Sequence, residues 1–297
     1  MAADSRTIAA TTRAQGRRRW RPILVSLLAI ALAATVWTLI ETGRRDTERL
    51  RQEHFDFFKR VEQQGGKVGF HQDSNLLTKS SDWLRTKVGW GLPGVRPKQY
   101  LGSLVLMGPA ITDADMRLLA DLRRLESLEF YETRVSDDGL RPLRDLKGLT
   151  RLVFDPQITD AGLEHLSDLG HLTTLDLINT RVRGEGLSHL SGLSRLKDLY
   201  LTSTPLGDRG LQEIAAMRSL EKLYLNYTQI SDAGLRHLSG LKDLTVLCLS
   251  GTRISDAGLE HLTGLTNMER LELDGTEVSD AGVRTLQAAL PNARISR

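Results

Sequence analysis

One unit of about 24 residues recurs from Leu101 to the C-terminal end of the chain. The units start at Leu101, Leu125, Leu149, Leu172, Leu196, Leu220, Leu244 and Met268, in steps of 24 with a single step of 23. Each unit reads L-x-x-L-x-L, usually then x-x-T-x-[IV], and ends with [ST]-D-x-G-L-x-x-L-x-x-L. A unit this short cannot bury its own leucines, so the eight copies must stack on one another in single file.

The spacing inside each unit predicts its local structure. The two leucines of L-x-L lie on one face of a short strand, because side chains alternate along a strand. Leucines three residues apart after the turn place an apolar stripe on a short helix or 3₁₀ segment. The sequence therefore predicts a curved α/β solenoid in which each repeat sets a strand beside the next strand and carries a short helix.

Two polar ladders accompany the leucines. Threonine recurs where the chain leaves each strand, and its hydroxyl can bond backbone groups of neighbouring turns; these residues are Thr133, Thr180, Thr204, Thr228, Thr252 and Thr276. Ser-Asp or Thr-Asp precedes most helical segments, at residues 112–113, 136–137, 159–160, 231–232, 255–256 and 279–280. These pairs are predicted to be helix N-caps, with the carboxylate near the positive end of the helix dipole.

Over residues 101–290 the pattern resembles the leucine-rich-repeat family, in particular bacterial proteins with a T-D-A-G-L core that are related to internalin-like and F-box-associated repeats. The resemblance implies a horseshoe with a parallel sheet on its concave side and short helices on its convex side, whose usual role is recognition. The chain departs from the pattern at Pro109 and Gln157, which stand at the threonine position, and at Arg183-Gly184, which replaces Ser-Asp. One residue is also missing around 155–157, so the local shape of repeats three and four is expected to differ, with a possible role in facing a ligand.

The N-terminal region predicts a membrane segment. Residues 23–40 carry no charge, a length that nearly spans a hydrocarbon core of about 30 Å, and four arginines precede them within residues 17–21. This favours a basic cytoplasmic tail over residues 1–21, a transmembrane signal anchor over 22–40, and a body outside a cytoplasmic membrane. The alternative is a signal peptide that is cleaved after Ala31-Leu32-Ala33, which would release the body as a secreted protein.

Residues 41–100 are expected to form a juxtamembrane helix and an N-terminal cap. Apolar residues follow helical spacing before Gly65-Gly66, and Val68 and Phe70 then alternate as in a strand. The leucine-rich-repeat domain is assigned to 101–297, and Pro291 to Ile295 resembles a truncated ninth strand that serves as a short C-terminal cap. The body is expected to be monomeric.

Charge and motifs exclude several functions. Residues 1–60 hold 12 basic and 6 acidic side chains, whereas residues 61–297 hold 28 and 31, so the repeats lack the basic balance of a nucleic-acid-binding domain. The single cysteine, Cys248, cannot form an internal disulfide, and no histidine is placed on the concave face to activate it. No phosphate-binding, hydrolase or zinc-protease motif is present, so we expect neither an enzyme nor a cofactor.

Two ladders could suggest a metal site. His165, His189, His237 and His261 recur in L-x-H-L, one in each of four repeats. Their regular placement is more typical of a solvated consensus position on the convex helices than of a metal site. Calcium binding by the aspartates is likewise not required, because capping explains each one separately.

The side chains before and after the middle leucine of each strand should face the concave solvent side. Tyr200 and Tyr224 then fall at the same position of adjacent strands, with Tyr227 just beyond the second. Tyrosine is enriched at the energetic centres of interfaces, so this cluster is the predicted binding surface. Its proposed contact residues are Tyr200, Tyr224, Tyr227, Asp176, Asp198, Lys222, Asn226 and Arg270.

These observations predict a membrane-anchored, non-catalytic module that binds a protein or peptide through its concave face. The alternatives are a structural envelope protein whose repeats self-associate and, as a minor possibility, an enzyme with an unrecognised site. The alternative for the tyrosine cluster is that tyrosine merely suits an exposed strand.

Overall fold

The computed structural model describes residues 49, 52–53, 56–57, 59–61, 63–64, 67–70 and 101–297. The predicted basic tail and membrane segment, residues 1–21 and 22–40, lie outside this part of the chain, as do residues 71–100 of the predicted cap. No helix within the described residues is long and apolar enough to cross a membrane.

The chain divides into two compact units, Met1–His54 and Phe55–Arg297. In the first unit, Arg49, Gln52 and Glu53 are helical, and Arg49 pairs with Glu53 one turn later (Nε to Oε1, 3.9 Å). The second unit contains the repeats and all of the strands.

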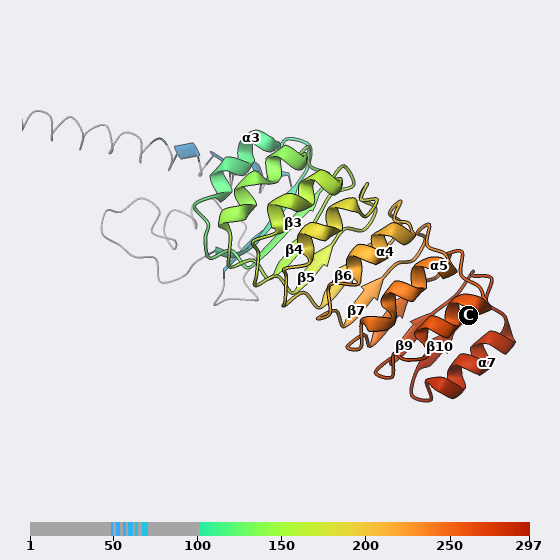
Figure 1. The fold of residues 1–297 in the computed structure, drawn as a ribbon. Helices are drawn as coiled ribbons and strands as arrows, with labels where there is room; N and C mark the ends of the chain where they lie inside the picture. The colour runs from blue at the N-terminus through green and yellow to red at the C-terminus, as the bar shows by residue number, and fades with distance from the viewer. Residues whose placement is uncertain are drawn as a thin grey trace, which may run out of the picture. The chain divides into compact units, whose positions relative to one another are not determined.

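The second unit is built on a ten-stranded sheet whose strands follow chain order (Figure 1). The first strand, β1 (Lys67–Phe70), runs antiparallel to β2, and all later pairs are parallel. The strands are β2 Leu101–Met107, β3 Ser127–Tyr131, β4 Arg151–Val153, β5 Thr174–Asp176, β6 Asp198–Tyr200, β7 Lys222–Tyr224, β8 Val246–Cys248, β9 Arg270–Glu272 and β10 Arg294–Ser296. The last of these confirms the truncated ninth strand of the repeat series.

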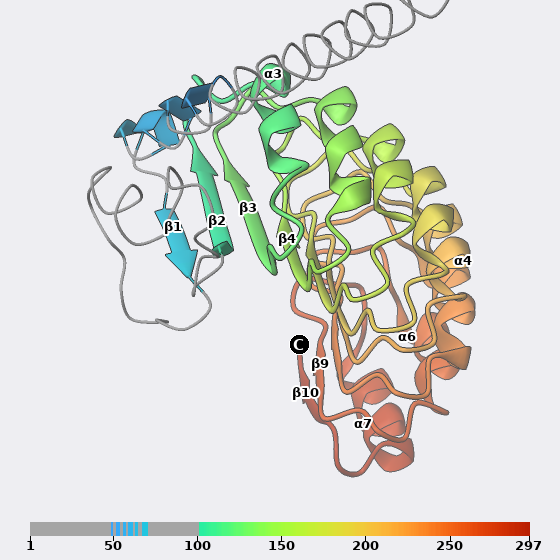
Figure 2. The same ribbon diagram turned by 90° about the vertical axis from the view of Figure 1, so that its left-hand side faces the viewer.

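Short α and 3₁₀ helices line the opposite side of each repeat and form the outer layer of the arc (Figure 2). They are α3 Asp113–Met116, η1 Arg117–Leu119, η2 Asp137–Asp145, η3 Asp160–Leu166, η4 Glu185–Leu190, α4 Asp208–Ile214, α5 Asp232–Leu235, η5 Arg236–Gly240, α6 Asp256–Leu259, η6 Glu260–Leu262 and α7 Asp280–Ala289. The predicted solenoid, with a parallel sheet and short helices on opposite sides, is confirmed.

The core is a continuous column of aliphatic side chains between the two layers. Leu199 and Leu223, the middle leucines of β6 and β7, pair in register and are both fully buried. Phe57 and Val61 are also fully buried and belong to the same cluster, before the first repeat. The leucines of each repeat are therefore buried only because the neighbouring repeat packs against them.

Five of the six ladder threonines are buried and Thr276 is half-buried, and most of the ladder does not bond as predicted. The hydroxyl of Thr228 donates to the carbonyl of Leu225 in its own repeat (2.7 Å), and the same bond is made by Thr180, Thr204, Thr252 and Thr276. The prediction of bonds to neighbouring turns is wrong at these five residues, because each hydroxyl bonds the carbonyl three residues earlier in its own repeat. Each bond satisfies a carbonyl at the tight turn after a strand.

The aspartate ladder joins consecutive repeats. Asp208 accepts the backbone N–H of Ser231 at Oδ1 (2.8 Å) and its hydroxyl at Oδ2 (2.6 Å), so the N-cap residue of one helix is held by the previous repeat. The same two bonds recur for Asp113–Ser136, Asp137–Thr159, Asp232–Ser255 and Asp256–Ser279. The aspartates thus lie in the first helical turn, as capping requires, and also bind repeat to repeat.

The fourth repeat departs from this ladder where Arg183-Gly184 replaces Ser-Asp. Gly184 has a φ of +117°, which glycine adopts readily, and its N–H donates to Asp160 Oδ1 (2.9 Å). Gly184 stands where the next aspartate would be, and Glu185, one residue later, pairs with the exposed Arg209 (3.0 Å). A Cβ on Gly184 would lie 2.5 Å from the Cα of Gly210, so the backbones of repeats four and five approach closely here.

Candidate binding surface on the concave sheet

Alternation along the strands places the predicted side chains on the inner face of the sheet. The middle leucine of each three-residue strand is buried, whereas Asp198, Tyr200, Lys222 and Tyr224 on either side of it are half-buried. Parallel pairing sets Asp198 beside Lys222 and Tyr200 beside Tyr224. The face therefore consists of two rows, one formed by the first residue of each strand and one by the third.

The two tyrosines form the centre of this face. The rings of Tyr200 and Tyr224 are stacked, with centroids 4.4 Å apart and planes inclined by 6°. Burial, and then the neighbouring Tyr200, raises the pKa of Tyr224 to about 12, so the Tyr224 side chain is a neutral phenol near pH 7. A rigid aromatic pair with two hydroxyl groups offers a partner both apolar contact and hydrogen bonds.

Charged side chains border the pair. Lys222 Nζ lies 3.4 Å from Asp198 Oδ1 in the first row. Asp176 is the register neighbour of Tyr200 in the third row, and burial raises the pKa of its carboxyl group. The structure thus brings five of the eight predicted contact residues together: Tyr200, Tyr224, Asp176, Asp198 and Lys222.

The other three contact residues have different surroundings. Tyr227 is 67% exposed in the left-handed turn after β7, where its ring covers Gly251 of the next repeat. Asn226 accepts the backbone N–H of Ser250 at Oδ1 (2.8 Å), which gives it a structural role that the sequence analysis missed. Arg270 lies two strands beyond Lys222, with Val246 between them, and bonds Glu272 on its own strand.

Cys248 follows Tyr224 in the third row but is only 1% exposed. Burial, followed by a hydrogen bond with Glu272, raises the pKa of its thiol to about 12. Since the thiolate is the nucleophilic form of cysteine, this environment leaves the group unreactive near pH 7.

The four histidines do not share one environment. His189 and His261 are exposed, as expected for the convex helices, but His165 is only 4% exposed. The prediction of a solvated position is wrong for His165, which belongs to η3, a helix that packs against both η2 and η4. Burial lowers its pKa, and its Nδ1 has no hydrogen bond among the described residues. No group of three potential metal ligands occurs within the described part of the chain.

In the shortened third repeat, the side chains of Asp155 and Gln157 make hydrogen bonds to the preceding repeat that take the place of backbone bonds. In the fifth repeat, for comparison, the N–H of the left-handed Ser203 donates to the carbonyl of Asn226 in the next repeat (2.8 Å). At the corresponding place Asp155 accepts the N–H of Glu132 (2.7 Å) and both the N–H (2.8 Å) and the hydroxyl (2.5 Å) of Thr133. The amide of Gln157 donates to the carbonyls of Thr133 and Val135.

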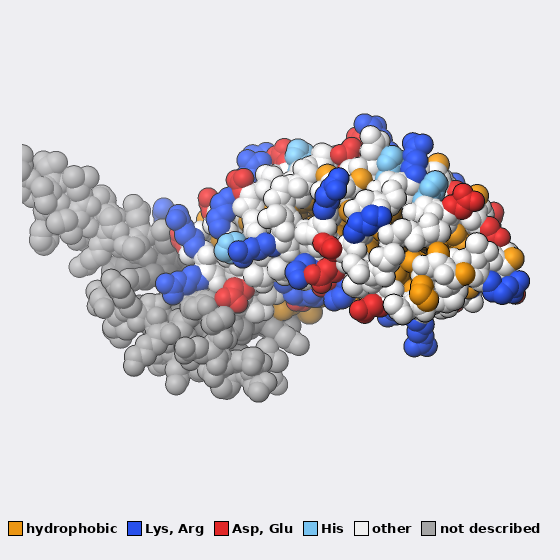
Figure 3. Space-filling view, turned by 60° about the horizontal axis from the view of Figure 1, so that its bottom comes forward, with side chains coloured by type: hydrophobic (Ala, Val, Ile, Leu, Met, Phe, Trp, Pro, Cys, Tyr) orange, Lys and Arg blue, Asp and Glu red, His pale blue; other side chains and the backbone are white. Residues whose placement is uncertain are grey.

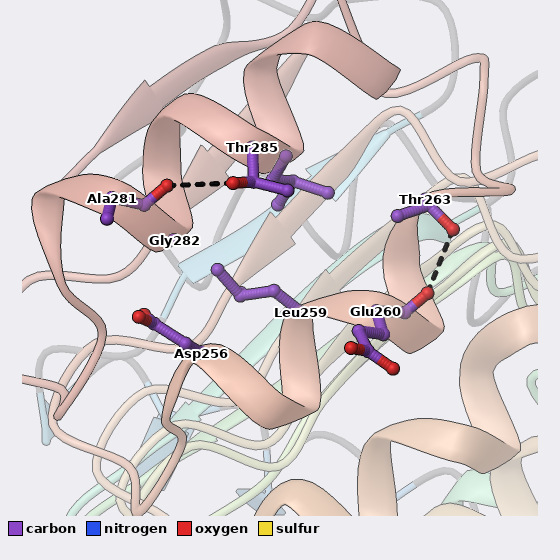
Figure 4. Close-up of a pocket in the computed structure, with 8 residues that line it drawn as sticks. Asp256, Leu259, Glu260, Thr263, Ala281, Gly282 and Thr285 are labelled. Atoms are coloured by element: carbon purple, nitrogen blue, oxygen red, sulfur yellow. Dashed lines mark hydrogen bonds between the residues drawn. The ribbon is translucent and has the colours of Figure 1, made fainter.

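A small groove lies on the convex side, between α6–η6 and α7, with a volume of about 260 Å³ (Figure 4). Its hydroxyl groups are bonded within their own helices, Thr263 to the carbonyl of Glu260 and Thr285 to that of Ala281. Asp256, at its rim, is engaged with Ser279, which lowers the pKa of the carboxyl group. These polar groups serve the fold. On the face drawn in Figure 3, positive and negative side chains are interspersed, and hydrophobic areas lie mainly toward the C-terminal end.

Comparison with known proteins identifies the repeat. A leucine-rich-repeat family model matches residues 194–215 and 216–239. No curated protein sequence matches the chain. Among solved structures, internalin C2 from Listeria monocytogenes is 25% identical over 66% of this chain and 80% of its own, with a TM-score of 0.54. An internalin (inlF) from the same organism is 22% identical over 60% of this chain, with a TM-score of 0.49; the match spans 55% of that protein.

Proposed function

We propose that this chain, whose repeats have the leucine-rich-repeat fold, is a non-catalytic recognition module that binds a protein or peptide partner through its concave sheet. The observation that carries the proposal is the stacked pair Tyr200–Tyr224, which is half-exposed on a preordered surface and bordered by Asp198 and Lys222. A rigid sheet loses little conformational freedom on binding, and tyrosine is frequent among the residues that contribute most to interface affinity. The leucine-rich-repeat fold is typically non-catalytic and commonly serves protein interaction.

A photo-crosslinking residue in place of Tyr224, in cells that express the full chain, tests this proposal. The expected result is a discrete crosslinked species that contains a second protein, identified by mass spectrometry. The matched control carries the crosslinker at His189, which is exposed on the convex side and should give no such species. Crosslinking of the chain only to itself would favour self-association instead.

The double variant Tyr200→Ala/Tyr224→Ala should weaken binding of the crosslinked partner about tenfold or more, because both halves of the stack are lost. Binding of the purified partner is measured by calorimetry, with Arg209→Ala on the convex side as the control. Unchanged affinity in the double variant would remove the tyrosine pair from the interface.

We also propose that residues 22–40 anchor the chain in a cytoplasmic membrane with the repeats on the outer side. The charge-free run of residues 23–40 and the arginines before it support this arrangement. In cell fractionation, the full chain should sediment with membranes and resist extraction by carbonate. Deletion of residues 22–40 should move it to the soluble fraction, and a mature N-terminus near Ala34 would instead show that the segment is a cleaved signal peptide.

A further inference from the structure

A hollow of about 740 Å³ lies where β3, β4 and β5 end, at the shortened third repeat. The turns on either side contain the left-handed residues Glu132 and Asn179, whereas the described residues 154–158 between them include no residue of positive φ. The lining residues are Met107, Phe130, Tyr131, Glu132, Thr133, Val153, Phe154, Asp155, Pro156, Gln157, Asp176, Ile178 and Asn179. Its volume falls in the range of sites for small ligands and side chains.

The charge of this hollow is one-sided. Glu132, Asp155 and Asp176 line it, and its lining includes no lysine, arginine or histidine. Arg151, at the start of β4, pairs with Glu129 (Nε to Oε1, 3.1 Å) and also attracts the Asp176 carboxylate. A positively charged group that entered the hollow would still meet a lining that holds carboxylates and no cationic side chain.

Asp176 is the carboxylate best placed to bind that group. Its Oδ1 accepts the N–H of Ile178 (2.9 Å), and the described residues supply no hydrogen-bond donor to its Oδ2. Asp155, by contrast, is 4% exposed, and both of its carboxylate oxygens accept hydrogen bonds from Glu132 and Thr133. The free oxygen of a partly desolvated carboxylate forms strong hydrogen bonds with a cationic donor.

The walls of the hollow are apolar and aromatic. Met107 and Ile178 are half-buried, Val153 is buried, and Tyr131 is 39% exposed, with its hydroxyl donating to Glu129 (2.9 Å). An arginine side chain combines an aliphatic stem for such walls with a planar cation that stacks on a tyrosine ring and bonds a carboxylate. Lysine carries a more strongly hydrated charge and lacks the planar group.

We propose that this hollow binds an arginine side chain of the partner polypeptide, with the guanidinium at Asp176 Oδ2 and the stem against Tyr131 and Ile178. The inference rests on the proposed function, because Asp176 also borders Tyr200 and so joins the hollow to the tyrosine surface. It adds the chemistry of the partner: a segment with an arginine about one strand spacing from the residue that contacts the tyrosines.

The test uses the full chain and N-acetyl-arginine amide as the probe. Titration followed by the methyl signals of Met107 and Ile178 should show saturable, millimolar binding. Asp176→Asn, which keeps the acceptor for Ile178, should weaken binding about fivefold or more through loss of the charged partner. The neutral analogue N-acetyl-citrulline amide should bind no better to the wild type than the arginine probe binds to this variant.

Two controls separate this inference from the tyrosine surface. Asp198→Asn, on the adjacent strand and paired with Lys222, and Tyr224→Ala, two strands from Asp176, should both leave binding of the arginine probe unchanged. Because burial raises the pKa of Asp176, affinity should fall as the pH falls through that pKa, and Asp176→Asn should abolish this dependence. Absence of binding to the wild type, or equal binding by Asp176→Asn, would refute the arginine site while leaving the proposed function intact.

Discussion

Replacement of Asp155 by alanine is expected to lower the free energy of unfolding by about 3–5 kcal/mol, the cost of removing one partner from a buried charged network. The carboxylate is 4% exposed and accepts three hydrogen bonds, from the N–H of Glu132 and from the N–H and hydroxyl of Thr133. Alanine would leave these donors buried without acceptors. Asp155→Asn should cost less, about 1–2 kcal/mol, because one amide oxygen remains as an acceptor. Urea unfolding followed by circular dichroism measures the change.

Asp274 provides the matched control for Asp155. It occupies the equivalent position, six residues after the start of its repeat, but it is exposed and its Oδ2 accepts a hydrogen bond from the hydroxyl of Ser296 (2.9 Å). Asp274→Ala should therefore change stability by no more than about 0.5 kcal/mol. Similar losses of stability at both positions would show that the hydrogen bonds of Asp155 to Glu132 and Thr133 are not the cause of its contribution.

Gly186→Ala is expected to lower the free energy of unfolding by about 2–3 kcal/mol, the typical cost of inserting atoms into a packed interface. A Cβ at this position would lie 2.8 Å from the carbonyl carbon of Asp160, a backbone atom that no side-chain rotation can move away. The shift would also strain the bond from Gly186 N–H to Asp160 Oδ1 (2.8 Å), which joins repeats three and four. Thermal and urea unfolding should both report the loss.

Gly192, six residues later in the same repeat, is the control for Gly186. A Cβ there meets no heavy atom within 4 Å, so Gly192→Ala should be within about 0.5 kcal/mol of the wild type. If the two substitutions destabilise equally, the close approach of η3 and η4 is not the cause.

The fold was predictable because the leucine spacing specifies which side chains share a face. Leu223 and Leu225 are fully buried and Tyr224 between them is not, as alternation along a strand requires. The choice among hydrogen-bond acceptors was not predictable in the same way. The repeat spacing does not specify whether the Thr228 hydroxyl bonds its own turn or the next, and in the structure it bonds the carbonyl of Leu225.

The candidate surface was likewise only partly predictable from the sequence. The repeat period alone placed Tyr200 and Tyr224 together. The hydrogen bond from the Ser250 N–H to Asn226 Oδ1 depends instead on the local geometry of one turn, which the period does not specify. The missing residue near 155–157 was visible in the sequence. The hollow beside it was not, because it depends on how Asp155 and Gln157 fold back over the gap. The recurrence of Asp and Gly at fixed spacing in successive units was the signal that could have revealed the inter-repeat aspartate bonds.

The register of the sheet has a consequence for how this architecture can change in length. Each residue of strands β6 to β9 pairs with the residue 24 positions further along the chain, for example Leu199 with Leu223 and Leu223 with Leu247. Duplication or loss of one whole coil would therefore preserve every pairing on both sides, because the new neighbour presents the same groups as the old one. Insertion or deletion of a multiple of 72 nucleotides would therefore lengthen or shorten the concave sheet. The packing of the leucines and the aspartate hydrogen bonds between repeats would be restored with the same kinds of contact.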